Sequence, residues 1–111
     1  MEAFTRCKVH HLRRTVLRDG RPVVIWGAGP VGKLFARELL RCGSQVEGFV
    51  EVDPRKLGKA IYGIPVRGAD DASPRGAVAL GAVAGTAARG RLRALAREQG
   101  RSEGADFVAV A

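Results

Sequence analysis

The stretch that decides the fold is Val23-Val24-Ile25-Trp26-Gly27-Ala28-Gly29-Pro30-Val31-Gly32. It begins with four apolar residues, the length and pattern of a parallel strand that is buried on both faces. The glycines that follow have GxGxxG spacing, and apolar residues at helical spacing continue from there to Cys42. We therefore expect a strand, a tight glycine turn and a helix over residues 31–42.

Each glycine of this turn has a separate role. Gly27 permits the tight turn, Gly29 lets the backbone approach a phosphate, and Gly32 lets the helix pack closely on the strand. Pro30 fits the first helical turn, where its missing N–H group is no loss. Free amides and a positive dipole at the start of a helix attract anions. The candidates for holding the phosphates of a nucleotide are Gly27, Ala28, Gly29, Pro30, Val31 and Gly32. The alternative is a glycine turn that only packs the fold.

The same stretch nearly matches a second phosphate-binding motif, the P-loop. Gly27, Gly32 and Lys33 have GxxxxGK spacing. The next residue of a P-loop is a Ser or Thr that coordinates magnesium, but here it is Leu34. An NTP hydrolase of this kind is therefore excluded.

Two acidic residues lie about 20 residues after the glycines, near the end of a second expected strand over residues 46–52. A carboxylate at this position accepts hydrogen bonds from ribose hydroxyls. Glu51 is the first candidate for that role, and Asp53 is the second. An ordinary solvated strand end is the alternative for Glu51, whereas Asp53 could instead cap the turn that starts at Pro54.

The rest of the chain continues the alternation of helices and strands. The expected segments are a basic amphipathic helix over residues 2–19, a short edge strand over 61–66 interrupted by Gly63 and Pro65, a loop over 69–74, a buried strand over 77–80, a helix over 86–99 and a final strand over 107–110. The fold class expected from this order is α/β. We predict a Rossmann-like three-layer domain over residues 21–111, with a parallel sheet of about four to five strands, preceded by the basic helix in residues 1–20.

A ligand of an open parallel sheet lies where the strand order reverses. The turn over residues 81–86 should therefore face the glycine turn. Its side chains are nearly all inert, so Gly81 and Thr86 are candidates through backbone amides and the Thr86 hydroxyl. Arg89, one turn into the next helix, is a candidate phosphate partner, although a simple solvent-exposed side chain is the favoured interpretation.

Composition limits the function further. The 111 residues carry a net charge of +8, but arginine is scattered over the whole chain, so we interpret the charge as compositional bias and do not expect nucleic acid as a partner. The two cysteines, Cys7 and Cys42, lack CxxC spacing, and the N-terminus has no apolar core of a secretory signal. With no apolar run long enough to span a bilayer, these features favour a soluble protein of the cytoplasm.

No set of residues has the pattern of a catalytic site. His10 and His11 are adjacent, so on a helix they point in different directions and make a poor metal pair. No nucleophile and base are placed together, and there is no second lobe to hold a substrate. We expect no catalytic or metal-binding residues in this chain, although a larger parent protein could be an enzyme.

Two segments carry a resemblance to known families. They are Gly48-Phe49-Val50-Glu51-Val52-Asp53-Pro54-Arg55-Lys56-Leu57-Gly58-Lys59 and the ending Glu103-Gly104-Ala105-Asp106-Phe107-Val108. The ending, together with Phe4-Thr5-Arg6-Cys7-Lys8, the basic helix and Arg21-Pro22-Val23-Val24-Ile25-Trp26-Gly27-Ala28-Gly29, resembles the C-terminal Rossmann-like domain of bacterial family 2 glycosyltransferases. The run over residues 48–59, followed by Gly63-Ile64-Pro65-Val66-Arg67-Gly68, is similar to the nucleotide-binding N-terminal domain of sugar O-acyltransferases.

The resemblance implies a ligand and a context. In the acyltransferases this domain binds a UDP-sugar. A similar pattern of strand, acidic residue and proline occurs in NADH-responsive repressors, so the resemblance implies NAD(P) as the alternative cofactor. In the glycosyltransferases a catalytic domain lies upstream. The positions that match the shared pattern are Gly27, Gly29, Gly32 and Glu51. The chain departs from it at Gly81-Ala82-Val83-Ala84-Gly85, where relatives often carry Arg or Asn near the ligand.

We therefore expect an accessory nucleotide-binding domain, with a UDP-sugar or NAD-type ligand, in a glycosyltransferase or sugar-modifying protein. One alternative is a subunit of an NAD(P)-dependent oxidoreductase. Another is a ligand-free interaction module, or a basic module that binds nucleic acid through its first helix.

Overall fold

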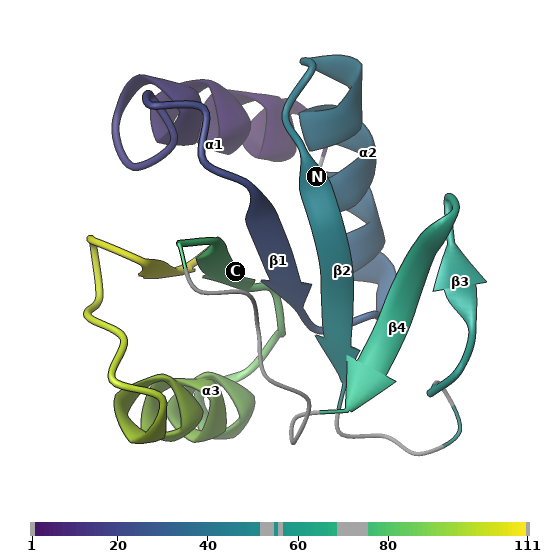
Figure 1. Cartoon of the computed structure of the whole chain (residues 1–111), viewed down its shortest axis with the longest axis vertical. Helices are drawn as coiled ribbons and strands as arrows, with labels where there is room; N and C mark the ends of the chain where they lie inside the picture. The colour runs from purple at the N-terminus through teal and green to yellow at the C-terminus, as the bar shows by residue number, and fades with distance from the viewer. Residues whose placement is uncertain (1, 52–54, 56, 69–75, 111) are drawn as a thin grey trace.

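One β-sheet forms the centre of the molecule, with helices on both of its faces (Figure 1). The computed structural model describes residues 2–51, 55, 57–68 and 76–110. Along the chain the elements are α1 (Glu2–Arg14), β1 (Val23–Trp26), α2 (Pro30–Arg41), β2 (Val46–Glu51), β3 (Ala60–Ile61), β4 (Ile64–Gly68), β5 (Val78–Gly81), α3 (Thr86–Glu98) and β6 (Phe107–Ala109).

The strand order in the sheet is β3-β4-β2-β1-β5-β6. β1 pairs in parallel with β2 on one side and with β5 on the other. The chain thus builds outward from β1 in one direction and later returns to extend the sheet in the other. The strand order reverses between β1 and β5, and this is where ligands bind in open α/β sheets.

The expected parallel sheet of four to five strands is wrong, because the described sheet has six strands and β3 runs antiparallel to β4. A hairpin turn splits the segment that was predicted as one edge strand. Tyr62 and Gly63 both have positive φ, 53° and 76°, which is typical of a tight two-residue hairpin turn. Ile61 and Ile64 consequently face each other across the turn. The molecule is a small α/β domain with a mixed sheet, and not a purely parallel Rossmann sheet.

The first helix is shorter than expected. α1 ends at Arg14, and the hydroxyl of Thr15 donates a hydrogen bond to the carbonyl of His11 at 2.8 Å, while the next residues form turns up to Gly20. The apolar face of α1 packs on the rest of the domain, since Val9 and Leu12 are buried in the same core as α2. Figure 1 shows α1 beside α2.

Two apolar layers fill the space between the sheet and the helices. On one face, α1 and α2 contribute Val9, Leu12, Phe35 and Leu39. On the other face α3 covers a smaller cluster that contains Trp26 and Phe107, whose ring centroids lie 5.3 Å apart. Trp26 is fully buried, and among the described residues its indole Nε1 has no hydrogen-bond acceptor.

The helices are too short for a membrane span. The longest, α1 and α3, each have 13 residues, whereas about 20 apolar residues are needed to cross a bilayer. Within the described part of the chain no helix combines the necessary length and hydrophobicity.

Candidate functional site

The glycine turn lies at the carboxyl end of β1 and is fixed to the strands on both sides. The amide of Gly27 donates to the carbonyl of Val50 at 2.8 Å, and the amide of Ala82 donates to the carbonyl of Trp26 at 2.9 Å. The turn therefore sits between the end of β2 and the loop after β5, at the point where the strand order reverses.

Gly27 and Gly32 make contacts that no other residue allows. Gly27 has φ of +121°, and a Cβ there would lie 2.7 Å from the carbonyl oxygen of Ala82. A Cβ on Gly32 would lie 1.9 Å from the carbonyl oxygen of Gly27, far inside van der Waals contact. The close approach of the loop after β5 explains Gly27, and the close approach of α2 to the turn explains Gly32, with or without a ligand.

The start of α2 leaves amides without partners in the helix. Gly29 is the N-cap and Pro30 the first helical residue, and among the described side chains none caps this end. No acidic residue stands in the first turn. Because the first N–H groups of a helix have no carbonyl within the helix to bond, the amides of Val31 and Gly32 and the positive end of the dipole are available to an anion.

Glu51 reaches the glycine turn. Its Oε1 accepts a hydrogen bond from the amide of Ala28 at 3.1 Å, and the residue is half-buried. From the sequence, Glu51 was expected at the end of β2, with a role in ribose recognition. Its hydrogen bond to the turn was not predicted, because the bond joins residues that are 23 positions apart in the chain. The second predicted acid, Asp53, lies outside the described residues.

The loop after β5 contributes backbone rather than side chains. Gly81 is the buried last residue of β5, and a Cβ there would lie 3.1 Å from Phe107 and 3.3 Å from Leu92. Its absent side chain makes room for the α3 face, so the role that the structure gives Gly81 is packing. Thr86, the first residue of α3, is exposed at the predicted edge. Arg89 is half-buried within α3.

Sequence reasoning missed the part played by Ala82 and Val83. An added Cβ on Gly27 would lie 2.7 Å from the carbonyl oxygen of Ala82 and 2.9 Å from Cγ1 of Val83, so these two residues pack directly against the glycine turn. The signal was present in the small residues after β5, which were interpreted only as inert.

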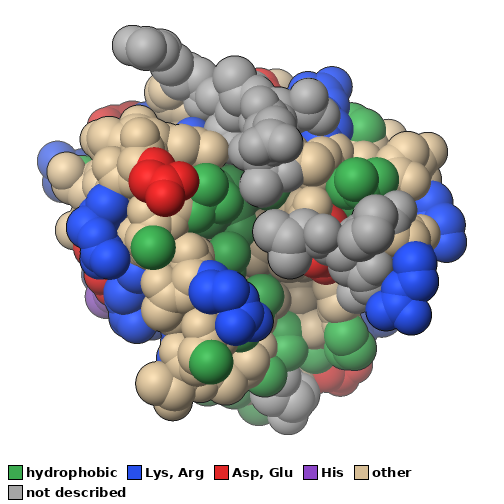
Figure 2. Space-filling view, turned by 90° about the horizontal axis from the view of Figure 1, so that it is seen from below, with side chains coloured by type: hydrophobic (Ala, Val, Ile, Leu, Met, Phe, Trp, Pro, Cys, Tyr) green, Lys and Arg blue, Asp and Glu red, His purple; other side chains and the backbone are tan. Residues whose placement is uncertain are grey.

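The second helix that starts at this edge repeats the features of the first. α3 begins after Gly85, and within the described residues it has neither a side-chain cap nor an acid in its first turn. Two positive helix ends therefore point toward the edge where β1 and β5 finish. Figure 2 looks at the molecule from this end, and Lys and Arg side chains lie on both sides of the face.

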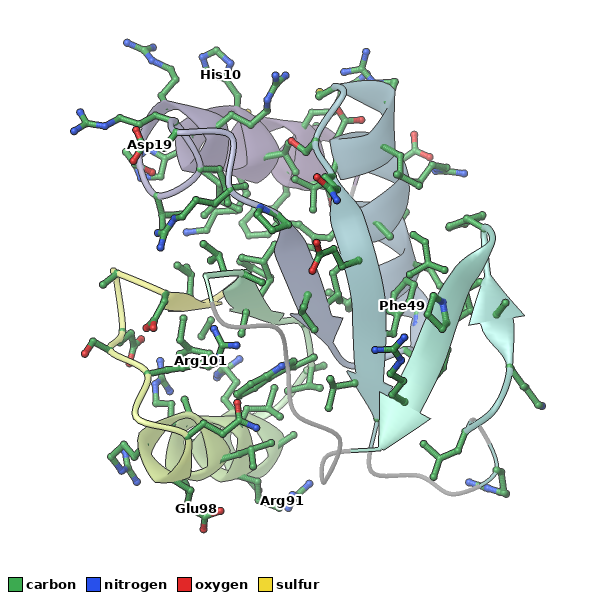
Figure 3. All side chains as sticks on the ribbon, viewed as in Figure 1. His10, Asp19, Phe49, Arg91, Glu98 and Arg101 are labelled. Atoms are coloured by element: carbon green, nitrogen blue, oxygen red, sulfur yellow. The ribbon has the colours of Figure 1, made fainter. Side chains whose placement is uncertain are left out.

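Nothing in the described chain resembles a metal centre. Among these residues there is no group of three or more His, Cys, Asp and Glu side chains that could hold a metal ion. Figure 3 shows His10 on α1, projecting away from the sheet and far from the glycine turn.

No model of a known protein family matches the sequence, and a search of curated proteins finds no match either. The function therefore has to be inferred from the geometry above.

Proposed function

We propose that the edge between the glycine turn and the start of α3 binds the phosphates of a nucleotide. The observation that carries this proposal is that α2 and α3 both start just after the neighbouring strands β1 and β5, where the strand order reverses, and neither has a described side-chain cap or an acid in its first turn. The glycine motif supports it less, since packing alone accounts for Gly27 and Gly32.

The ligand that we propose is a UDP-sugar or an NAD-type dinucleotide. Both carry a pyrophosphate, which suits the amides of Val31 and Gly32, and both carry a ribose, which suits a carboxylate held beside the turn at Glu51. We further propose that the domain serves as an accessory module, next to a catalytic domain of a glycosyltransferase or sugar-modifying protein. The cytoplasm is the compartment that we propose, because Cys7 and Cys42 are both free thiols.

Thermal unfolding with added ligand tests the proposal. The full chain is heated with 1 mM NAD, NADH or a UDP-sugar, and with CoA and S-adenosylmethionine as other nucleotides. A Kd near 100 µM would add about 1.4 kcal/mol and raise the melting temperature by roughly 5–10 °C. No shift with any of these compounds would contradict nucleotide binding.

A charge variant locates the binding. Thr86→Asp puts a carboxylate at the start of α3, where it is compatible with the fold and repels a bound phosphate. The matched control is Ala3→Asp, which adds the same charge to the exposed first turn of α1. We expect the ligand-induced shift to disappear in Thr86→Asp and to persist in Ala3→Asp. Equal loss in both variants would place the ligand elsewhere.

A further inference from the structure

A concave surface lies at the end of α2 opposite to the glycine turn. A groove of about 610 Å³ separates α1 from the last turn of α2, and its wall includes Arg6, His10, Arg13 and Arg14 of α1 with Glu38 and Arg41 of α2. The 12 residues of α2 separate this groove from the glycine turn, a distance of about 18 Å. It is therefore distinct from the proposed nucleotide site.

The basic residues of α1 form one stripe. Positions 6, 10, 13 and 14 have i, i+4, i+7 and i+8 spacing, which places them along one side of a helix over about 12 Å. The neighbouring face, with Thr5, Val9 and Leu12, is buried in the core. Because Val9 and Leu12 are used in the core, Phe4 is the one large apolar side chain that the described residues of α1 expose, and the basic stripe remains for a ligand from solution.

The charges of the groove are not balanced. Among the described residues that line it, Glu38 is the one acid, and it is paired with Arg41, whose Nε lies 3.1 Å from Oε1. Hydrogen bonds from Arg41 hold the pKa of the Glu38 carboxyl below its usual value, so it stays ionised. Within the described part of the chain, Arg6, Arg13 and Arg14 have no hydrogen bond or ion pair.

Helix stability explains only some of these arginines. Arg13 and Arg14 stand in the last turn of α1, where a cation favours the helix dipole. Arg6 stands in the first half of the helix, where the dipole gives it no such benefit, although its charge also interacts with the Glu38 carboxylate. An anion in the groove explains all three together, because guanidinium groups bind phosphate oxygens in a bidentate manner.

We propose that this groove binds a small soluble anion with two or more phosphate groups. The three arginines of α1 line the hollow, and its volume is that of a small-molecule site, about 300–1,000 Å³. Nucleic acid is the competing class of ligand. A nucleic acid strand would extend beyond the groove. It would therefore contact Lys8 and Arg18, which do not line the groove, to a similar degree as the groove arginines.

Calorimetric titration with inorganic tripolyphosphate at low salt tests the proposal on the full chain. Arg6→Gln/Arg14→Gln removes two groove charges, and the matched control Lys8→Gln/Arg18→Gln removes two charges outside the groove. We expect at least a tenfold loss of affinity in the first variant and less than a twofold loss in the second. Absence of binding to the unmodified chain, or equal loss in both variants, would overturn the proposal.

Glu38→Gln gives an independent readout that does not depend on losing arginines. The amide can still accept a hydrogen bond from Arg41, but the negative charge is gone, so tripolyphosphate should bind a few-fold more tightly. Weaker binding in Glu38→Gln would overturn the proposal. A single-stranded oligonucleotide that binds more tightly than tripolyphosphate, and is equally sensitive to both double variants, would also overturn the proposal. Binding to phosphatidylserine vesicles would overturn it as well.

Thr86→Asp separates this site from the nucleotide site. Tripolyphosphate binding at the groove should be unchanged in that variant, even if no nucleotide binds at the glycine turn. Loss of tripolyphosphate binding in Thr86→Asp would assign the anion to the sheet edge and overturn the groove site.

Discussion

The glycine turn after β1 and the loop after β5 lie side by side at one edge of the sheet, but packing constrains them very differently. At Gly27 and Gly32 an added Cβ would meet backbone oxygen at 2.7 and 1.9 Å. At Gly85 in the second loop, an added Cβ would meet nothing within 4 Å. The GxGxxG spacing is thus first a requirement of close packing, of the turn against the second loop at Gly27 and of α2 against the turn at Gly32. The features that favour a ligand are the uncapped helix ends, which both loops share.

The largest effect that we expect is from Gly32→Ala. The new methyl group would overlap the carbonyl of Gly27, so α2 must move off the sheet, at a cost of about 3 kcal/mol or more. Urea unfolding followed by circular dichroism measures this loss. The control is Gly90→Ala in α3, where space is open and alanine should stabilise the helix by about 0.5–1 kcal/mol. Similar stability in Gly32→Ala and the unmodified chain would contradict the close packing.

Gly27→Ala should have the next largest effect, about 2–3 kcal/mol, because it combines a positive φ with a clash against Ala82. Gly43→Ala separates the two causes. Gly43 has φ of +84° and open space, so alanine there should cost only about 1 kcal/mol. If both variants lose the same stability in urea unfolding, then the contact between the turn and the second loop has no energetic weight.

Glu51→Ala should destabilise the domain by about 1–2 kcal/mol, since it leaves the amide of Ala28 without its charged acceptor. Glu51→Gln retains an oxygen acceptor and should lose less than half as much. Hydrogen exchange at Ala28, measured by NMR, should speed up markedly in the alanine variant. Unchanged exchange there would show that the carboxylate does not hold the turn.

Gly85→Ala tests how tightly the loop after β5 is packed. No atoms crowd the position, so the cost is that of the backbone alone: φ of +94° with ψ of 145° is a conformation that favours glycine, and alanine should lose about 1–2 kcal/mol there. Thermal unfolding should therefore show a clearly smaller shift than for Gly27→Ala. A shift as large would mean that the second loop is packed as tightly as the first.

The smallest effect is expected for Thr86→Asp, and its sign is opposite. A carboxylate in the first turn of α3 interacts favourably with the helix dipole and should stabilise the free protein by about 0.5 kcal/mol. The same variant should lose ligand-induced stabilisation. If the melting temperature of Thr86→Asp rises and the ligand still stabilises the variant, then the start of α3 is not part of the binding site.

The sequence predicted what local patterns determine. The strand at β1, the turn and α2 were all visible, because an apolar run, three glycines and a helical period occur within 20 residues. The hairpin at Tyr62-Gly63 was missed, since Tyr rarely adopts the positive φ that the turn needs, so the segment looked like one strand. The Glu51–Ala28 bond and the groove between α1 and α2 depend on contacts between distant residues, which no local pattern reveals.

Trp26 gives the domain its own optical reporter. It is the chain's one tryptophan, it is fully buried, and it directly precedes Gly27. Its emission should be blue-shifted in the native state and move to longer wavelength when β1 leaves the sheet. Changes at the glycine turn can thus be followed by intrinsic fluorescence, without attaching a label to the edge where the ligand is proposed to bind.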